Sequence, residues 1–146
     1  MNLCIDQGNS RTKIALFKKD GRIVKNLLYK SFTSADVERL FSLYPITQSI
    51  VSSVANMEPA VINALNRLSK KFVLFDHLTP LPIKNCYQTP ETLGHDRIAA
   101  AVGAAHLCPG QNLLIVDAGS AVTYDFVSAE QGYLGGNIAP GIKMRL

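Results

Sequence analysis

Two short segments of this chain repeat the same order of residue types, each directly after a run of apolar residues. The first occupies residues 6–13 and the second residues 117–123; both begin Asp-x-Gly, and Thr12 corresponds to Thr123. Glycine in such a turn lets the chain reverse and lets its backbone approach a ligand closely. A strand–turn–strand unit that occurs twice predicts two related lobes in one chain.

The apolar spacing around the first copy predicts a mixed α/β lobe. Asp20 and Gly21 form a hairpin turn signal, the pair Thr33 and Ser34 can cap a helix, and Pro59 is suited to a first helical position. The predicted strands cover residues 3–5, 13–17, 22–29, 49–54 and 72–75, with helices following Thr33 and Pro59.

Three prolines lie within residues 76–93, which predicts a loop or linker there. An alanine-rich helix is expected over residues 96–107, then a strand at 113–116 and a hairpin of 121–127 with 132–138. The organisation predicted from this order is a first lobe with its linker over residues 1–93. Residues 94–146 would supply a connecting helix and the first strands of an incomplete second lobe.

The composition is that of a soluble globular protein: among 146 residues, 47% are hydrophobic and 18% charged. No apolar run approaches the roughly 20 residues of a membrane helix, and the N-terminus lacks a signal-peptide pattern. Cys4, Cys86 and Cys108 are too few and too scattered for a disulfide framework or a zinc site. We therefore expect a cytoplasmic protein without a membrane partner.

Positive charge is concentrated in the first half of the chain, mostly between Arg11 and Lys30. A basic cluster can bind nucleic acid, but no aromatic residues interleave this one to stack on bases. A solvated hairpin is the preferred interpretation, and no nucleic-acid partner is expected. Steeply salt-dependent binding to DNA or RNA would overturn that expectation.

The turn at residues 6–13 has the donors of a phosphate cradle. Successive backbone N–H groups near Gly8, the side chains of Asn9 and Ser10, and the charge of Lys13 can all face phosphate oxygens. Asp6 can hold Mg²⁺ that bridges to the phosphate, directly or through water. The alternative is a capped hairpin whose Asp side chain accepts hydrogen bonds from backbone amides. The second copy favours phosphate binding, whereas the spacings of a P-loop and of a Rossmann turn are absent.

Two further segments carry polar chemistry. Asp96 and Arg97 open the alanine-rich helix, where Asp96 is either a simple N-terminal cap or a general base for a substrate hydroxyl. Arg97 can bind a substrate carboxylate or stabilise the charge of the transferred group. The glycine pair at 135–136, followed by Pro140, allows close backbone approach or merely a tight chain reversal. His77 and His106 are isolated and are interpreted as surface or packing residues.

These motifs together resemble type III pantothenate kinase, within the actin, sugar kinase and acetate kinase superfamily. That family carries D-x-G-N-[ST]-x-x-K, G-x-D-R with an upstream Tyr, D-x-G-[ST]-[AC]-x-T and G-G-x-I-x-P-G, in this order. The matching residues are Asp6, Gly8, Asn9, Ser10 and Lys13; Tyr87, Gly94, Asp96 and Arg97; Asp117, Gly119, Ser120, Ala121 and Thr123; and Gly135, Gly136, Ile138, Pro140 and Gly141. The resemblance covers the whole chain and implies ribonuclease H-like, mixed-sheet lobes.

The resemblance further implies ATP-dependent phosphorylation of pantothenate to 4'-phosphopantothenate, the first step towards coenzyme A. It implies Mg²⁺, a monovalent cation such as K⁺ or NH4⁺, and a homodimer. Asp96 would be the general base, Asp6 would organise Mg²⁺, and Asp117 would lie by the monovalent cation. The implied phosphate-binding residues are Asp6, Gly8, Asn9, Ser10, Lys13, Gly119, Ser120 and Thr123; those lining the pantothenate pocket are Tyr87, Gly94, His95, Asp96 and Arg97.

The family's chain continues beyond its G-G-x-I-x-P-G turn, whereas this sequence stops at Leu146. We therefore expect residues 1–146 to be an incomplete enzyme with little or no kinase activity alone. One alternative is a non-catalytic relative that resembles an accessory factor of transcription regulation; the intact Asp6, Lys13, Asp96 and Asp117 speak against it. The other is a kinase for a different small hydroxy acid.

Overall fold

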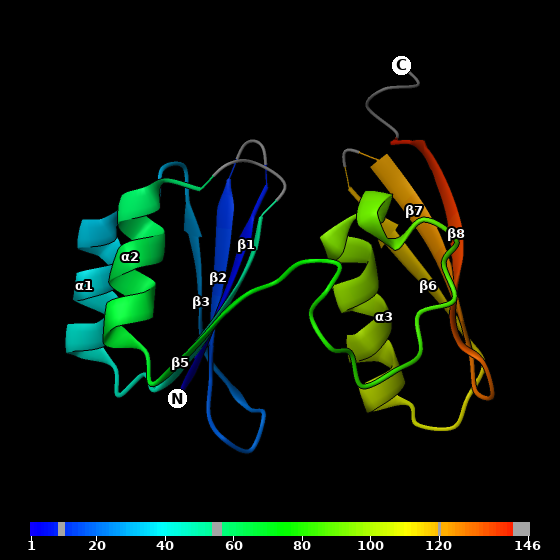
Figure 1. The fold of residues 1–146 in the computed structure, drawn as a ribbon, viewed down its shortest axis with the longest axis horizontal. Coiled ribbons are helices and arrows are strands. Elements are labelled where there is room, and N and C mark those ends of the chain that lie inside the picture. The colour runs from blue at the N-terminus through cyan, green and yellow to red at the C-terminus, as the bar shows by residue number, and fades with distance from the viewer. Residues whose placement is uncertain (9–10, 54–56, 120, 142–146) are drawn as a thin grey trace. The chain divides into compact units, whose positions relative to one another are not determined.

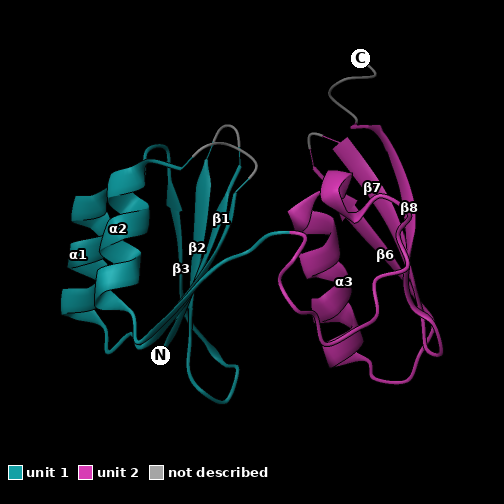
Figure 2. Ribbon diagram, in the orientation of Figure 1, with its two compact units in different colours: residues 1–76 teal, residues 77–146 magenta. Residues whose placement is uncertain are grey.

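The structure, a computed structural model, describes residues 1–8, 11–53, 57–119 and 121–141. It divides into two compact units, unit 1 at Met1–Asp76 and unit 2 at His77–Leu146 (Figure 2). Among the described residues, no helix has both the length and the apolar character needed to cross a membrane. Cys4, Cys86 and Cys108 are all free thiols.

Unit 1 is a five-stranded mixed sheet with the strand order β3-β2-β1-β4-β5. Its central strand β1 runs antiparallel to β2 and parallel to β4. The elements follow the order expected from the sequence: β1 (Asn2–Gln7), β2 (Thr12–Phe17), β3 (Ile23–Tyr29), α1 (Ser34–Leu43), β4 (Gln48–Ser53), α2 (Pro59–Leu68) and β5 (Lys71–Leu74). The prediction of a mixed α/β lobe is confirmed.

Both helices of unit 1 begin where the sequence places their start signals. The Thr33 side chain caps α1, and Asp36 completes a capping box by accepting from the Thr33 amide at 3.0 Å. Pro59 occupies the first turn of α2, where no helical N–H is needed. The two helices lie on the same side of the sheet (Figure 1). They form the core with it, joining residues such as Val37 and Leu65 to the inward side chains of β1 and β2.

Unit 2 is a three-stranded antiparallel sheet with one long helix against it (Figure 1). Its elements are a 3₁₀ turn η1 (Pro90–Thr92), α3 (His95–Leu107), β6 (Leu113–Ala118), β7 (Ala121–Ser128) and β8 (Gly132–Pro140). The helix covers one face of the sheet and buries Ile98 and Ala101 there with Val127 and Tyr133. The helix and the hairpin predicted from the sequence are confirmed.

Residues 77–93 belong to unit 2 by their contacts, although the sequence predicts them to be the linker of the first lobe. Asn85 forms an isolated parallel bridge with Tyr133. On either side of it, the Cys86 amide donates to the Tyr133 carbonyl at 2.8 Å and the Tyr133 amide donates to the Lys84 carbonyl at 2.9 Å. The segment thus runs along β8 and brings Tyr87 towards α3.

The strand pairing confirms the internal repeat and corrects one detail of it. Asp6 pairs with Lys13 across β1 and β2, and Asp117 pairs with Thr123 across β6 and β7. The second turn is therefore one residue shorter than the first. Matching Thr12 to Thr123 by counting from each aspartate was wrong, because the position equivalent to Thr123 is Lys13.

The same register exposes a difference between the two sheets. Leu3, Ile5, Ile14 and Leu16 are at most 3% exposed beneath α1 and α2. When Asp6 is matched to Asp117 and Lys13 to Thr123, the residues at the same positions of β6 and β7 are Leu114, Val116, Tyr124 and Phe126. These four are 39–67% exposed. These four side chains alternate with those that face α3, so they lie on the opposite face of the sheet. We call them the open face of unit 2.

Candidate functional site

The first Asp-x-Gly turn joins β1 to β2. Asp6 and Lys13 lie opposite each other where the two strands meet the turn, and Lys13 Nζ is 3.8 Å from Asp6 Oδ2. Their side chains are 42% and 74% exposed, so both charges face water. The Gly8 amide donates to the Arg11 carbonyl at 3.0 Å and closes the turn. Asn9 and Ser10 lie outside the described residues.

The second turn joins β6 to β7, and Thr123 takes the place that Lys13 has in the first. Its Gly119 amide donates to the Ala121 carbonyl at 2.8 Å. Asp117 is exposed, and its partner Thr123 is half-buried. Ser120 lies outside the described residues. The two turns therefore differ in charge, because Lys13 offsets the first aspartate and a neutral hydroxyl faces the second.

The start of α3 presents Asp96 to solvent. Gly94 is the N-cap residue, His95 is half-buried, and Asp96 is exposed. The Arg97 amide donates to Asp96 Oδ1 at 2.9 Å. Among the described residues, the other carboxylate oxygen of Asp96 has no hydrogen-bond partner. A Cβ added to Gly94 would lie 2.6 Å from Asp96 Oδ1. Glycine at the first position of the G-x-D-R motif therefore leaves room for this carboxylate.

Arg97 points the other way, into unit 2. Its side chain is 6% exposed and forms an ion pair with Asp125, which is 1% exposed. Nε lies 3.1 Å from both carboxylate oxygens, and Nη2 donates to Oδ1 at 2.6 Å. Tyr133 Oη donates to the same oxygen at 2.7 Å. The hydrogen bond with Asp125 raises the pKa of Arg97, and burial raises that of Tyr133.

Tyr87 completes this group. The guanidinium carbon of Arg97 lies 6.0 Å from the centre of the Tyr87 ring, within the range of a cation–π contact. The Tyr87 and Tyr133 rings are 6.3 Å apart and tilted by 40°. The half-buried ring also lies against Gly135 of β8.

The structure thus sorts the predicted site residues into three groups, each within one unit. Unit 1 holds the turn with Asp6, Gly8 and Lys13. Unit 2 holds the turn with Asp117, Gly119 and Thr123, and it brings together the group at the start of α3: Tyr87, Gly94, His95, Asp96 and Arg97.

Asp125 and Tyr133 are not among the site residues predicted from the sequence. One signal was available for Asp125, since a charged residue stands between Tyr124 and Phe126 in a strand of otherwise uncharged residues. A carboxylate at an inward position of a strand needs a partner. Nothing in the sequence indicated that the partner would be Arg97.

A magnesium ion needs little from the protein when phosphate oxygens and water supply most of its ligands. Within the described ranges, no three His, Cys, Asp or Glu side chains gather closely enough to hold a metal ion by themselves. Asp117 is exposed and the Asp6 side chain is 42% exposed, and each carboxylate lies at the end of a strand. This donor set fits an ion carried by a nucleotide and does not fit an all-protein cage.

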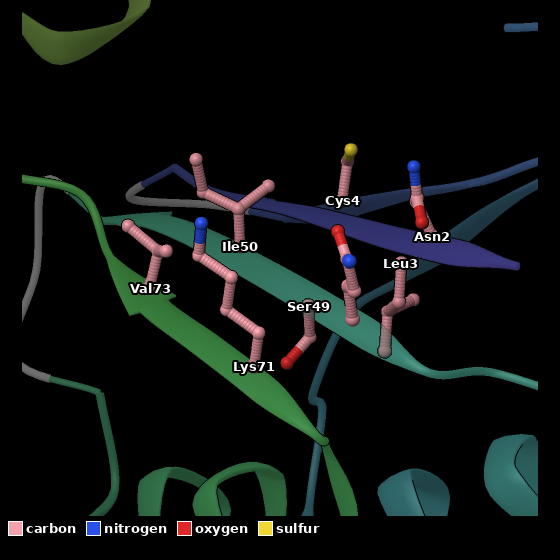
Figure 3. A pocket seen from close by; sticks show the side chains of 8 residues that line it. Asn2, Leu3, Cys4, Ser49, Ile50, Lys71 and Val73 are labelled. Carbon is pink, nitrogen blue, oxygen red and sulfur yellow. The ribbon is translucent and has the colours of Figure 1, made fainter. Parts of the chain in front are cut away.

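Unit 1 also has a shallow hollow of about 240 Å³ at the opposite end of β1 from Asp6. It is lined by Asn2, Leu3, Cys4, Gln48, Ser49, Ile50, Lys71 and Val73. Figure 3 shows Cys4 and Ile50 on one side of the strands, with Leu3 and Ser49 pointing to the other. Burial raises the pKa of the Cys4 thiol, so this cysteine has no activated thiolate. None of the predicted site residues lines the hollow.

Sequence comparison connects these groups to known proteins. A family model described as type III pantothenate kinase matches residues 2–146. A type III pantothenate kinase of Phocaeicola vulgatus is 43% identical over 145 residues, which are 99% of this chain and 60% of the relative. A type III pantothenate kinase of Bacteroides fragilis is 43% identical over 147 residues, which are 100% of this chain and 60% of the relative. The chain therefore spans about three fifths of the length of these relatives.

Comparison with solved structures supports the fold. A candidate 2-dehydro-3-deoxygalactonokinase of Sinorhizobium meliloti superimposes with a TM-score of 0.51 at 11% identity. The match covers 94% of this chain and 54% of that protein. At this identity the likeness concerns the fold alone, and it agrees with the actin-like mixed-sheet lobe expected from the sequence.

Proposed function

Because the chain belongs to the type III pantothenate kinase family, we propose that the protein transfers the γ-phosphoryl group of ATP to the primary hydroxyl of pantothenate. The observation that carries this proposal is the exposed Asp96 carboxylate at the start of α3. One of its oxygens is tied to the Arg97 amide. The other is available to accept the proton of a substrate hydroxyl as that hydroxyl attacks phosphorus.

The residues around Asp96 suit the binding of a small hydroxylated acid. Tyr87, Gly94, His95 and Arg97 surround the same helix start and would line the pantothenate pocket. Arg97 has Nε and Nη2 engaged by Asp125, so it would reach a substrate carboxylate with Nη1. Tyr87 would contribute an aromatic wall. These contacts would orient the hydroxyl towards Asp96.

The two Asp-x-Gly turns would bind the phosphates of ATP. Lys13 supplies an exposed positive charge, Thr123 a hydroxyl, and Gly8 and Gly119 the tight backbone of each turn. Asn9, Ser10 and Ser120 belong to the same proposed set. Asp6 would hold Mg²⁺, which when bound would neutralise charge on the transferred phosphoryl group. Asp117, whose partner across the strands is Thr123 and not a lysine, would lie at the site of the monovalent cation, K⁺ or NH4⁺.

The resemblance also carries two proposals about the protein in the cell. One is a cytoplasmic location, which agrees with the three free thiols because thiols stay reduced in that compartment. The other is a homodimer, which sedimentation equilibrium of the longest protein encoded by the reading frame would test. A single monomeric species across micromolar concentrations would contradict the dimer.

The kinase proposal is tested by mass-spectrometric detection of phosphopantothenate. The longest protein that the reading frame encodes is incubated with pantothenate, ATP, Mg²⁺ and K⁺. Asp96→Asn should abolish the product, whereas Glu130→Gln, which alters an exposed carboxylate in the β7–β8 turn, should leave it unchanged. A folded protein that makes no phosphopantothenate, or an Asp96→Asn variant with full activity, would contradict the proposal. Phosphorylation of another hydroxy acid instead would indicate a kinase with a different substrate.

A further inference from the structure

The start of α3 is fastened to the sheet of unit 2 by a buried polar network formed by Arg97, Asp125 and Tyr133. Asp125 Oδ1 accepts from Arg97 Nε, Arg97 Nη2 and Tyr133 Oη, while Oδ2 accepts from Arg97 Nε. The three side chains are 6%, 1% and 0% exposed. A carboxylate so fully occupied by donors has one orientation, and it fixes the guanidinium and the phenol in theirs.

Packing alone does not require this network. Apolar side chains of similar volume commonly stabilise a protein as well as a buried ion pair, because the pair must first lose its hydration. The same helix and sheet already pack through Ile98, Ala101 and Val127. The ion pair adds a defined orientation of the helix start, because a bidentate contact restricts its position more narrowly than apolar contact does.

The network touches both sides of the proposed substrate pocket. Arg97 follows Asp96 directly, so fixing Arg97 towards the sheet turns Asp96 about 100° away around the helix, towards solvent. The ring of Tyr87 lies over the Arg97 guanidinium and beside the Tyr133 ring. A displacement of Arg97 would therefore move the carboxylate and the aromatic wall together.

We propose that Asp125 and Tyr133 are positioning residues of this enzyme, which hold Asp96 and Tyr87 in place through Arg97. They touch neither the reacting hydroxyl nor the phosphate in this role. The inference rests on the proposed function for its kinetic consequences. Its structural consequence, an immobilised start of α3, does not depend on the reaction.

The test compares Asp125→Asn and Tyr133→Phe with Tyr124→Phe, an exposed tyrosine on the open face that serves as the matched control. Each variant is prepared in the longest protein of the reading frame, and its folded fraction is measured by urea unfolding. A change that only lowers stability reduces the amount of active enzyme and leaves both KM values unchanged. Loss of positioning instead lowers kcat per folded molecule and raises KM for pantothenate.

We expect Asp125→Asn to lower kcat at least tenfold and to raise KM for pantothenate, with KM for ATP unchanged. Tyr133→Phe, which removes one hydrogen bond, should act in the same direction by about three- to tenfold. The inference would be overturned if kcat and KM for pantothenate of both variants lay within twofold of those of Tyr124→Phe. If Asp125→Asn does not fold, the comparison of Tyr133→Phe with Tyr124→Phe decides alone.

Amide hydrogen exchange separates failure of this inference from failure of the proposed function. Tyr133→Phe should accelerate exchange at residues 97–101 of α3, and Tyr124→Phe should not. An inactive wild-type protein whose α3 start nevertheless loosens in Tyr133→Phe would contradict the kinase proposal and support the positioning role. An active wild-type protein with unchanged kinetics and exchange in Tyr133→Phe would contradict the positioning role alone.

Discussion

The ring of Tyr87 occupies the space where Gly135 lacks a side chain. A Cβ on Gly135 would lie 2.9 Å from Cδ2 of this ring, closer than real Cβ atoms approach, and 3.2 Å from Cε2. The same glycine has a φ of +107°, a conformation that residues with a side chain rarely adopt. One glycine of β8 thus serves two needs, since it allows the positive φ next to the register shift between β7 and β8 and makes room for the aromatic wall of the proposed pocket.

We therefore predict that Gly135→Ala destabilises the protein and disturbs the pocket. The positive φ should cost about 1–3 kcal/mol in free energy of unfolding, and displacement of Tyr87 should raise KM for pantothenate. Urea unfolding and steady-state kinetics measure the two effects. The matched control is Gly103→Ala, because Gly103 is exposed within α3 and a Cβ there meets nothing within 4 Å. That control should be stabilised by about 0.5–1 kcal/mol. Equal stability of the two variants would contradict this account of Gly135.

Gly94→Ala should reduce activity with a smaller effect on stability. Gly94 has a φ of −57°, which alanine adopts readily, so the N-cap should lose no more than about 1 kcal/mol. The new methyl group would, however, lie 2.6 Å from Asp96 Oδ1 and force this carboxylate to move. We expect kcat to fall about 10- to 100-fold, as is common when a reacting group is misplaced. An unchanged kcat in the folded variant would show that Asp96 is not the base or that its position does not matter.

Alkaline pH should destabilise the protein through Tyr133. Burial first, and then its hydrogen bond to Asp125, raise the pKa of Tyr133, while the Arg97 charge opposes this. Above about pH 10 the unfolded chain loses this proton more readily than the folded protein does. The stabilisation is therefore complete below about pH 10 and is lost as pH rises towards the pKa of the folded state. Urea midpoints at pH 9 and pH 11 should differ less for Tyr133→Phe than for the wild type; equal differences would contradict the raised pKa.

The three thiols should react with a disulfide reagent in an order set by exposure. Cys108 is exposed at the end of α3, whereas Cys4 is half-buried in β1 and burial raises its pKa. Because the thiolate is the reactive form, Cys108 should react first and Cys4 last at pH 8. Cys108→Ser should remove the fast phase and leave the slow one. Rapid labelling of Cys4 in the folded protein would contradict its assigned environment.

Most of the fold was predictable because its signals are local. The capping box at Thr33, the proline at the start of α2 and the turn at Gly21 each define an element boundary through nearby residues. Apolar periodicity then separated helices from strands. The length of the second turn was not predictable in this way, since the partner of Asp117 depends on the register of β6 with β7 and not on counting along the chain.

The candidate site was predictable only in part. The motif residues Asp6, Asp96 and Asp117 stand out because their types and spacing indicate phosphate and proton chemistry. The partnership of Arg97 with Asp125 joins residues 28 positions apart, and it exists because α3 folds back on β7. The sequence suggested Arg97 as a substrate contact but gave no sign of the buried ion pair in which Asp125 engages two of its nitrogens. Such contacts between distant segments have no local pattern.

The core of unit 1 is complete within Met1–Asp76: both helices and all five strands that enclose it come from this segment. A ribosome adds residues one by one from the N-terminus, and N-terminal domains commonly fold during synthesis. We expect unit 1 to reach its native state while later residues are still being joined to the chain. The open face of unit 2, with its four large apolar side chains, would by contrast attract chaperones or other newly made chains until it is covered. The two lobes of the repeat would then share an architecture but differ in when they reach their folded state during synthesis.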